Sequence, residues 1–437
     1  MKMFLAAGCL LMLAVSCYNK HLPDGTGEVQ NPITISSPTP QKQLTKVMLD
    51  EREEGYMAAG NRMAFRLLSR LYDGNSLICS PLSLQYALAM TSGGATGETR
   101  QEMLDFLGYG EDGQDALNAY CRKLLEQLPA VDLDVTLKLT DAILVREDFR
   151  LLPAFKKSVE ENYYAAAENM SFEDPAAVAA RINEWARRNT NGFIDNVLEP
   201  SDITQQAATF LMNALYFKAK WAGSEWDVMF NEQATYDEQF TREDGSKIQL
   251  PMMHNVRWHR YAECDGYKVL ALPYAGGKFC MYIILPDGNN LGQIIGRLQQ
   301  SAWADVLAGL KQDAEVHVKL PRFEIENKHN LKDALQVLGI KKAFVEGAAE
   351  FDGMFMPREE PWVFWIEKVI QKARISVTEW GTEAAAVTVV EMDAATDAGP
   401  DEHQPKQVYF NMDHPFAFVI GEATSGAILF EGVYSGK

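Results

Sequence analysis

The chain has 437 residues, a formal net charge of −19 and 47% hydrophobic residues. Such a composition is ordinary for a globular protein with a substantial core. Its few basic doublets, Arg187–Arg188 and Lys341–Lys342, are scattered. The absence of a basic stripe argues against nucleic acid and other polyanions as partners.

The first residues have the pattern of a signal peptide. One Lys precedes an apolar run in MKMFLAAGCLLMLAVSC, which is too short for a membrane-spanning helix. The small residues 14–16 before Cys17 resemble a bacterial lipoprotein box, although Leu is commoner where Ala14 stands. We therefore expect residues 1–16 to be removed and Cys17 to carry a lipid anchor. The protein would then be exported as a membrane-anchored lipoprotein, periplasmic or at the cell surface, or else secreted as an extracellular protein.

Residues 17–45 are rich in Pro, Thr, Ser and Gly, which predicts a flexible tether, lipid-anchored or free. From residue 46 to residue 437 no linker is evident, so we expect one domain. Four further cysteines form no CxxC pair and do not define a disulfide framework: Cys79, Cys121, Cys264 and Cys280.

Periodicity predicts helices first and strands later. Apolar residues at helical spacing predict helices over 49–72, over 80–108 with a break at Gly93–Gly94, and over 174–190 ending at Asn191–Gly192. A dense apolar run predicts a strand over 209–221, and alternating runs predict three antiparallel strands within 258–286. Two strands over 316–326, a helix over 331–339 and a closing hairpin over 408–434 follow. This order is typical of an α+β fold.

The sequence offers no recognisable enzyme site. His254 and His259 lie outside any HExxH motif, so we expect no metal site. The Gly-rich stretch 92–99 lacks the Lys-Ser/Thr of a phosphate-binding loop, and no GxSxG elbow is present. We expect no cofactor, and a hydrolase has no candidate nucleophile.

Residues 379–405, EWGTEAAAVTVVEMDAATDAGPDEHQP, have an unusual pattern. Over 382–394 every charge falls on an odd position, and the even positions are small or apolar, as in a half-buried strand. A stretch with Pro400 and Pro405 follows, which excludes a tight hairpin. The segment is either a plain strand that leads into a long loop or a segment with two states, exposed at first and a strand later.

Several motifs resemble those of the serpin family. EWGTEAAA is similar to the hinge of an inhibitory serpin, and the resemblance extends over residues 56–437, including SLICSPLSLQYALAMTSGGATGET, FLMNALYFKAKW, LPYAGGKFCMYIILPDG, FDGM and DHPFAFVI. It implies a bacterial serpin with N-terminal helices and a later β-rich region around a large central sheet. It also implies an exposed reactive loop, here residues 379–409.

The resemblance implies a suicide inhibitor of serine proteases and no enzyme activity. The protease cleaves the loop, and the hinge then inserts as a new central strand. The hinge residues carried over are Glu379, Gly381, Thr382, Glu383, Ala384, Ala385 and Ala386. The scissile bond is expected between Ala395 and Thr396, where a small residue suits an elastase-like protease; cysteine proteases are further candidate targets.

Five more positions match polar and aromatic sites that govern opening of the family's main sheet: Ser80, Ser83, Asn213, Trp221 and Gln371. Gln371 stands where many members have His, and it can still donate and accept hydrogen bonds. The loop beyond Thr396 is longer than usual, so cleavage after Met392, Ala394 or Thr396 remains open. We expect a monomer. The alternative is a non-inhibitory serpin that acts as a binding protein or a plain protease substrate.

Overall fold

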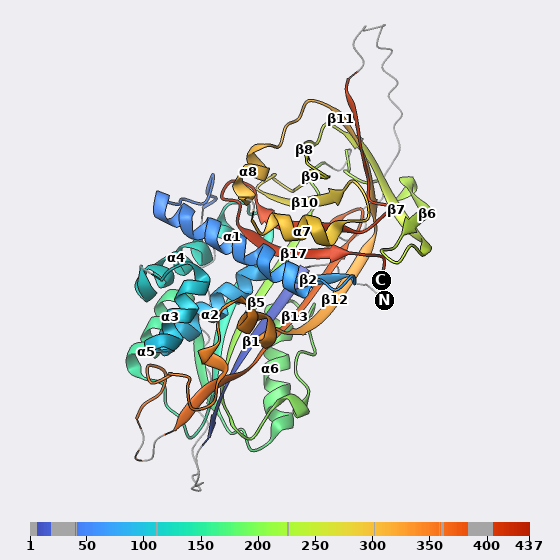
Figure 1. Cartoon of the computed structure of the whole chain (residues 1–437). Coiled ribbons are helices and arrows are strands. Elements are labelled where there is room, and N and C mark those ends of the chain that lie inside the picture. The colour runs from blue at the N-terminus through green and yellow to red at the C-terminus, as the bar shows by residue number, and fades with distance from the viewer. Residues whose placement is uncertain are drawn as a thin grey trace.

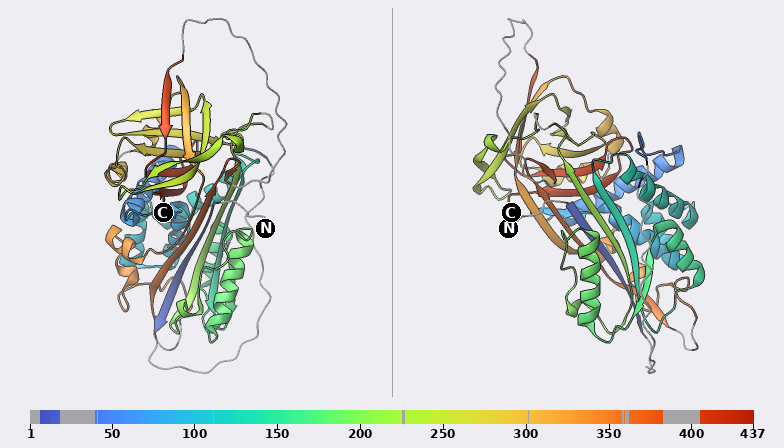
Figure 2. Two further views of the ribbon diagram at one scale, coloured as in Figure 1. Left: turned by 90° about the vertical axis from the view of Figure 1, so that its right-hand side faces the viewer. Right: turned by 180° about the vertical axis from the view of Figure 1, so that it is seen from behind.

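Three β-sheets, of seven, six and four strands, form the frame of the computed structural model (Figure 1). The structure describes residues 7–18, 40, 42–110, 112–224, 227–300, 302–357, 359, 362–382 and 405–437. Helices α1 to α5 gather on one face of the seven-stranded main sheet, and α6 lies on the other face (Figure 2).

The main sheet has the strand order β12–β13–β1–β5–β3–β4, and the short β14 pairs with β5 beside this path. Strand β1 is antiparallel to both neighbours, so β13 and β5 run parallel to each other on either side of it. The strands are β12 (Phe323–Asn330), β13 (Val363–Val377), β1 (Ala7–Tyr18), β5 (Ala207–Lys220), β3 (Thr136–Arg146), β4 (Ala166–Met170) and β14 (Gly381–Thr382).

The two smaller sheets lie in the upper part of the molecule in Figure 1. The second sheet contains β2 (Leu77–Cys79), β17 (Ile428–Tyr434), β16 (Phe416–Glu422), β10 (Phe279–Pro286), β9 (Tyr267–Tyr274) and β8 (Arg260–Cys264). The third contains β15 (Gln407–Asn411), β11 (Glu315–Pro321), β7 (Lys247–Arg257) and β6 (Thr235–Thr241).

Helices α1 and α6 begin at well-formed caps. Asp50 and Glu53 cap α1 reciprocally, each side chain accepting a hydrogen bond from the other's backbone N–H. Asp174 caps α6, and Pro175 supplies the fixed φ that suits a first helical position. The helices are α1 (Glu51–Leu71), α2 (Pro81–Gly94), α3 (Gly97–Leu107), α4 (Gly113–Gln127), α5 (Pro153–Tyr163), α6 (Pro175–Asn189), α7 (Leu291–Leu298), α8 (Trp303–Ala308) and α9 (Lys332–Leu338). Short 3₁₀ turns cover Leu128–Ala130, Pro200–Asp202, Glu232–Ala234 and Lys342–Phe344.

Each face of the main sheet packs against its own core. In β5, Leu211 and Leu215 enter the larger core beneath α1 to α5, whereas Phe210 and Met212 enter a smaller core covered by α6. Successive side chains of a strand point to opposite faces, so both faces of β5 are apolar. Such a strand is buried on both sides, which suits a position near the middle of a sheet.

Many predicted elements are confirmed. Helix α6 and strand β5 occupy the predicted ranges, α2 ends at Gly94, and β8, β9 and β10 form the predicted antiparallel meander. The two strands over 316–326 exist but do not pair with each other, because β11 belongs to the third sheet and β12 to the main sheet. Of the closing segment, β16 and β17 form the hairpin, and β15 pairs with β11.

The N-terminal segment has a position that the sequence analysis did not anticipate. Residues 1–16 are predicted to be a removable leader outside the domain, yet in the uncleaved chain Ala7–Tyr18 forms the middle strand β1 of the main sheet (Figure 2). Its apolar side chains explain this, because residues 11–15 are all buried. Removal of the leader remains a prediction, as does the tether, most of which lies outside the described residues.

Candidate functional site

The hinge predicted at residues 379–386 begins with a tight turn. Thr378 and Gly381 exchange backbone hydrogen bonds of 3.1 and 3.2 Å, so the chain leaving β13 reverses direction there. Gly381 has φ of +120°, and a Cβ atom at this position would lie 2.4 Å from the carbonyl oxygen of Ala219. Only glycine can make this reversal close to β5 without strain.

Glu379, at the tip of the turn, is held by Arg322 and Thr235. Arg322 donates from Nε and Nη2 to the carboxylate, and the Thr235 hydroxyl donates at 2.7 Å. Burial by itself raises the pKa of Glu379, but the hydrogen bonds from Arg322 and Thr235 outweigh it and leave the pKa below its usual value. Glu379 is therefore an ionised anchor for the start of the hinge.

Trp221, one of the residues predicted to govern opening of the main sheet, is next to this turn. Its Nε1 donates to the carbonyl of Thr378 at 2.8 Å, and its ring stacks on Tyr274 with centroids 4.6 Å apart. The Tyr274 hydroxyl is 2.8 Å from Oγ1 of Thr382, which is fully buried. The structure thus brings together three of the predicted residues: Trp221, Gly381 and Thr382.

Strands β14 and β1 lie end to end along β5. Gly381 and Thr382 pair with Lys220 and Ala219, and β1 starts two residues further along β5, where Ala7 pairs with Phe217. Both short segments run antiparallel to β5. The first residues after the hinge turn therefore point into the slot that β1 fills, which we call the β13/β5 gap.

Beneath the middle of this gap lie the four polar residues that the sequence analysis singled out. Gln371 donates to the carbonyl of Ser80 and accepts from its N–H, both at 3.0 Å, and Oγ of Ser80 accepts from the N–H of Ser83. Asn213 is not bonded to these residues; it donates instead to Asp141 at 2.9 Å. All four predicted side chains are fully buried: Ser80, Ser83, Asn213 and Gln371.

Asp141, which the sequence analysis did not single out, completes a row across the sheet. Gln371, Leu11, Asn213 and Asp141 are direct neighbours on β13, β1, β5 and β3 and share the face of the larger core. Burial raises the pKa of Asp141 to about 7, and the hydrogen bond from Asn213 opposes this only in part. In this part of the core, three buried oxygens find no hydrogen-bond partner among the described residues: Ser83 Oγ, Asp141 Oδ2 and Asn213 Oδ1.

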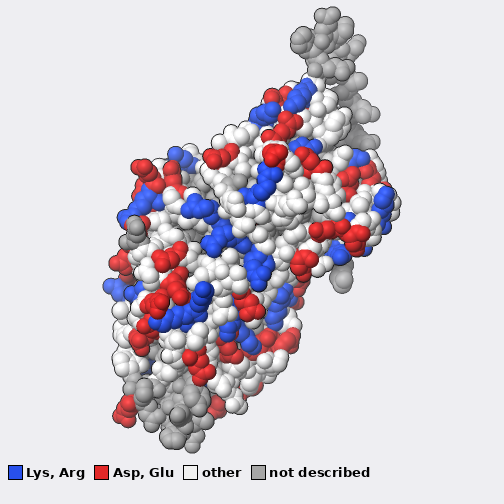
Figure 3. All heavy atoms as spheres, viewed as in Figure 1, with Lys and Arg blue, Asp and Glu red and all other residues white. Residues whose placement is uncertain are grey.

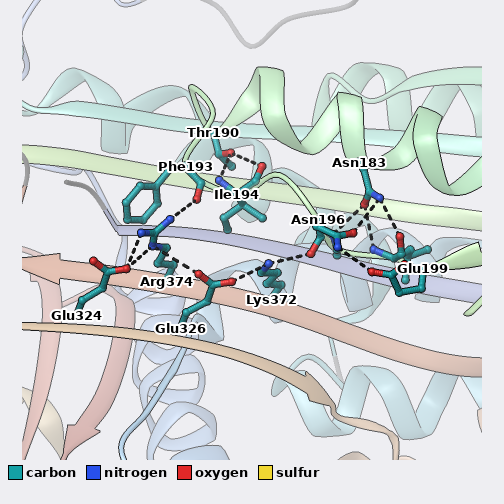
Figure 4. A network of polar contacts seen from close by, with 12 residues as sticks. Asn183, Thr190, Phe193, Ile194, Asn196, Glu199, Glu324, Glu326, Lys372 and Arg374 are labelled. Atoms are coloured by element: carbon teal, nitrogen blue, oxygen red, sulfur yellow. Dashed lines mark hydrogen bonds and ion pairs between the residues drawn. The ribbon is translucent and has the colours of Figure 1, made fainter. Parts of the chain in front are cut away.

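On the opposite face, residues 190–202, which we call the α6 strap, are bonded to β13. Lys372 donates to the carbonyl of Asn196 at 2.8 Å, and Arg374 contacts that of Phe193 (Figure 4). Lys368 donates to the carbonyl of Asp202 at 3.0 Å. Ile194 and Val197 of the strap share the smaller core with Met12 and Ala14 of β1. The strap thus covers the outer face of the β13/β5 gap.

The remaining predicted site residues lie outside the described residues. These are the later hinge positions Glu383, Ala384, Ala385 and Ala386, the expected scissile pair Ala395 and Thr396, and the side chain of Cys17. Their roles remain predictions.

Among the described residues, no group of three or more His, Cys, Asp and Glu side chains could hold a metal ion. Within the same part of the chain, no helix is both long and apolar enough to cross a bilayer. His259 is buried and bonded to Asn255, and burial lowers its pKa to about 4. On the face in Figure 3 acidic and basic side chains are interspersed, without a continuous patch of one sign.

Comparison with known proteins identifies relatives of nearly the whole chain. Residues 58–436 match the family model described as "Serpin (serine protease inhibitor)". An uncharacterised serpin-like protein of Thermococcus kodakarensis is 32% identical over 418 residues, which cover 93% of this chain and 94% of that protein. Serpin-Z2B of Triticum aestivum is 32% identical and covers 86% of this chain and 95% of its own length.

The fold is also that of solved structures. The crystal structure of tengpin, a thermophilic serpin in the native state, matches with a TM-score of 0.77 and 26% identity, covering 91% of this chain and 97% of tengpin. The predicted α+β fold with helices around a large central sheet is thereby confirmed.

Proposed function

This chain belongs to the serpin family, and from that premise we propose that it traps a serine protease by a conformational change. Serpins are in general protease inhibitors and not enzymes. In the proposed mechanism the protease cleaves the bond between Ala395 and Thr396 and becomes an acyl-enzyme. Residues 382–394 then enter the β13/β5 gap and carry the protease to the far end of the sheet before it deacylates.

The observation that carries this proposal is the pairing of β14 with β5. The hinge turn already directs Thr382 along β5 towards the gap, and a continued ladder would place Ala384 opposite Phe217. In that register residue 388 lies opposite Asn213 and residue 392 opposite Thr209. Each added ladder hydrogen bond contributes about 1 kcal/mol net, so a complete strand stabilises the inserted state strongly.

The same register suits the larger core. The positions of Leu11, Leu13 and Val15 would be taken by Thr388, Val390 and Met392, which are even positions of the loop. Val390 and Met392 would bury apolar surface at about 1.5–3 kcal/mol each. Thr388 would stand beside the unpartnered Oδ1 of Asn213, to which its hydroxyl can donate.

The charged positions of the loop would face the α6 strap. Glu391 would take the position of Ala14, which pairs with Lys368 of β13. Lys368, Lys372 and Arg374 all lie on this face of β13, so Glu391 is complementary to its neighbour Lys368, whereas Val387 and Ala385 would lie opposite Lys372 and Arg374. This complementarity supports insertion with the even positions inward.

Target specificity follows from the residue before the cleaved bond. Ala395 has a small side chain, which fits the shallow specificity pocket of elastase-like proteases. The longer loop leaves room for cleavage after Met392, Ala394 or Thr396. Mass spectrometry of the fragment released after reaction with elastase identifies the bond that is cut.

A matched pair of loop variants tests the trap. In the exported protein, Ala384→Glu would bury a carboxylate in the larger core at the start of insertion, at a cost of several kcal/mol. Ala385→Glu would place the same group opposite Arg374 on the other face. We expect the wild type and Ala385→Glu to form a covalent elastase complex on denaturing gels, and Ala384→Glu to yield only cleaved fragments.

The same gel experiment also tests the alternative function, that of a non-inhibitory serpin. If wild type, Ala384→Glu and Ala385→Glu are all cleaved without any covalent complex, the protein is a non-inhibitory serpin that acts as a binding protein or plain substrate. Complex formation by both variants to the same extent would show that the proposed register is wrong.

We further propose that the protein acts outside the cytoplasm on a lipid anchor at Cys17, with residues 17–45 as a tether. The support is the apolar leader followed by small residues and Cys. Cys17→Ala should move the protein from the membrane fraction to the soluble fraction, whereas Cys280→Ala should not. An equal distribution of Cys17→Ala and wild type would refute the anchor.

A further inference from the structure

The N-terminal strand β1 is fully integrated into the main sheet. It pairs with β13 from Gly8 to Tyr18 and with β5 from Ala7 to Ser16, with one register shift on each side. This segment is hydrogen-bonded along both edges and packed on both faces, as a peptide is when it is bound in a peptide-binding site.

The side chains of β1 match this site. Leu11, Leu13 and Val15 are fully buried in the larger core, and Met12 and Ala14 are buried beneath α6. Below them the buried Ser16 donates its hydroxyl to Glu367, which also accepts from Thr204 at 2.8 Å. The gap therefore accepts an extended peptide with medium-sized apolar side chains on both faces and a hydroxyl at its lower end.

The site is the one that the inhibitory mechanism requires. Strand β14 ends at Ala219 of β5 and β1 begins at Phe217, so any strand that continues β14 along β5 must displace β1. A ladder position can hold only one strand at a time. Occupation by β1 and insertion of the loop are mutually exclusive.

We propose that the β13/β5 gap is a binding site for the chain's own N-terminal segment, residues 7–18, and that a chain retaining this segment does not trap proteases. The second half of this statement rests on the proposed function. Removal of the leader during export then empties the gap and activates the inhibitor. The leader would thus keep the serpin inactive in the compartment where it is made.

The test uses the full chain synthesised without membranes, so that the leader is retained. Leu13→Arg places a guanidinium in the larger core, so β1 should leave the gap. Met48→Arg is the matched control, because Met48 is an apolar residue with 55% of its surface exposed. Leu13→Ser is the milder variant if the Arg variant folds poorly. Two readouts are compared: hydrogen exchange of the β5 and β13 amides, and covalent complex formation with elastase.

We expect wild type and Met48→Arg to protect the amides that point into the gap and to form no complex. Leu13→Arg should exchange these amides at least about tenfold faster and should trap elastase. Adding a peptide of residues 7–18 with a lysine tail should restore protection and abolish trapping.

The two readouts distinguish the possible failures. Equal exchange rates in wild type, Leu13→Arg and Leu13→Ser would refute the proposal that residues 7–18 bind in the gap. A protected wild type that traps elastase as fast as Leu13→Arg would overturn mutual exclusion. If Leu13→Arg exchanges faster, but neither this variant nor the exported protein forms a covalent complex, the binding site for residues 7–18 is supported and the proposed inhibitory function is refuted.

Discussion

Asp141 is the residue whose surroundings are least expected. Its carboxyl group is buried, receives one hydrogen bond from Asn213 and leaves Oδ2 without a partner among the described residues. A carboxyl in such a place keeps its proton near neutral pH, since burial raises its pKa to about 7.

Asp141 should make stability depend on pH. An unfolded Asp has a pKa of about 3.9, so between about pH 4 and pH 7 the unfolded chain releases a proton that the folded chain keeps. The free energy of unfolding therefore falls as the pH rises through this window, by about 4 kcal/mol in all, and levels off above it. Asp141→Asn has no proton to release and should lose this slope.

Urea unfolding of both proteins at pH 5 and pH 7 checks the prediction. Burial also raises the pKa of Glu431, to about 8, so Glu431 makes the free energy of unfolding fall with pH in the same way. Its contribution is the same in both proteins and cancels when the two are compared. Equal slopes for wild type and Asp141→Asn would show that Asp141 is ionised in the folded state.

At this scale the sequence predicted part of the site. Motif resemblance singled out Ser80, Ser83, Asn213, Trp221 and Gln371. In the structure Gln371 bonds to Ser80 and Ser80 to Ser83, Asn213 bonds to Asp141 instead, and Trp221 lies beside the hinge turn. Asp141 could not be predicted, because the chain has 60 acidic residues and nothing local distinguishes this one. Its environment depends on strand pairing between distant segments, which short-range patterns do not encode.

Among the elements, the α6 strap has the most consequential contacts. Lys372 donates to the carbonyl of Asn196 and pairs with Glu326 at 2.7 Å, and its side chain is only 13% exposed. The strap thus connects β13 with α6 across the gap. Because α6 packs against β5 in the smaller core, these bonds tie β13 to the layer that covers β5.

We expect Lys372→Met to lower the free energy of unfolding by about 1–2 kcal/mol, because the Asn196 carbonyl loses a charged donor whose own side chain is largely buried. Lys156→Met is the control: that side chain is 51% exposed and its nearest carboxylate oxygen is 3.8 Å away, so the change should stay below about 0.5 kcal/mol. Urea unfolding measures both, and equal effects would show that the strap bond contributes no more than a surface ion pair.

Elements with strong local signals were predictable, and others were not. Strand β5 has a long apolar run, whereas the sequence analysis missed β13, whose alternation is interrupted by Lys368, Lys372 and Arg374. These cations are acceptable because the strap supplies carbonyl partners. Strand β1 was interpreted as a leader for a sound reason, since an N-terminal apolar run has the same composition in either role.

For the whole molecule, the proposed mechanism predicts that the exported protein is metastable. Cleavage near Ala395 by a non-target protease frees residues 382–394 to complete the main sheet, and the melting temperature should rise by tens of degrees, even though the chain is large. The unprocessed chain already has a strand in the gap, so the same cleavage should change its melting temperature little.

Calorimetry of the four samples, exported and unprocessed, intact and cleaved, checks this. An unchanged melting temperature in the exported protein would mean that the loop does not insert. A large rise in the unprocessed chain would mean that the loop readily replaces β1.

The end-to-end arrangement of β14 and β1 also dictates how such a replacement would proceed. Only the ladder position of Lys218 separates Thr382 from the first residue of β1. An invading loop would therefore start from the two residues of β14 already paired with β5 and would advance by branch migration, as in strand exchange between nucleic acids. Each step would exchange one ladder pair for another, beginning at Ala7 and ending at Ser16. Weak pairing near Ala7 would speed the exchange, whereas the Ser16–Glu367 bond would hold the leader until the last step.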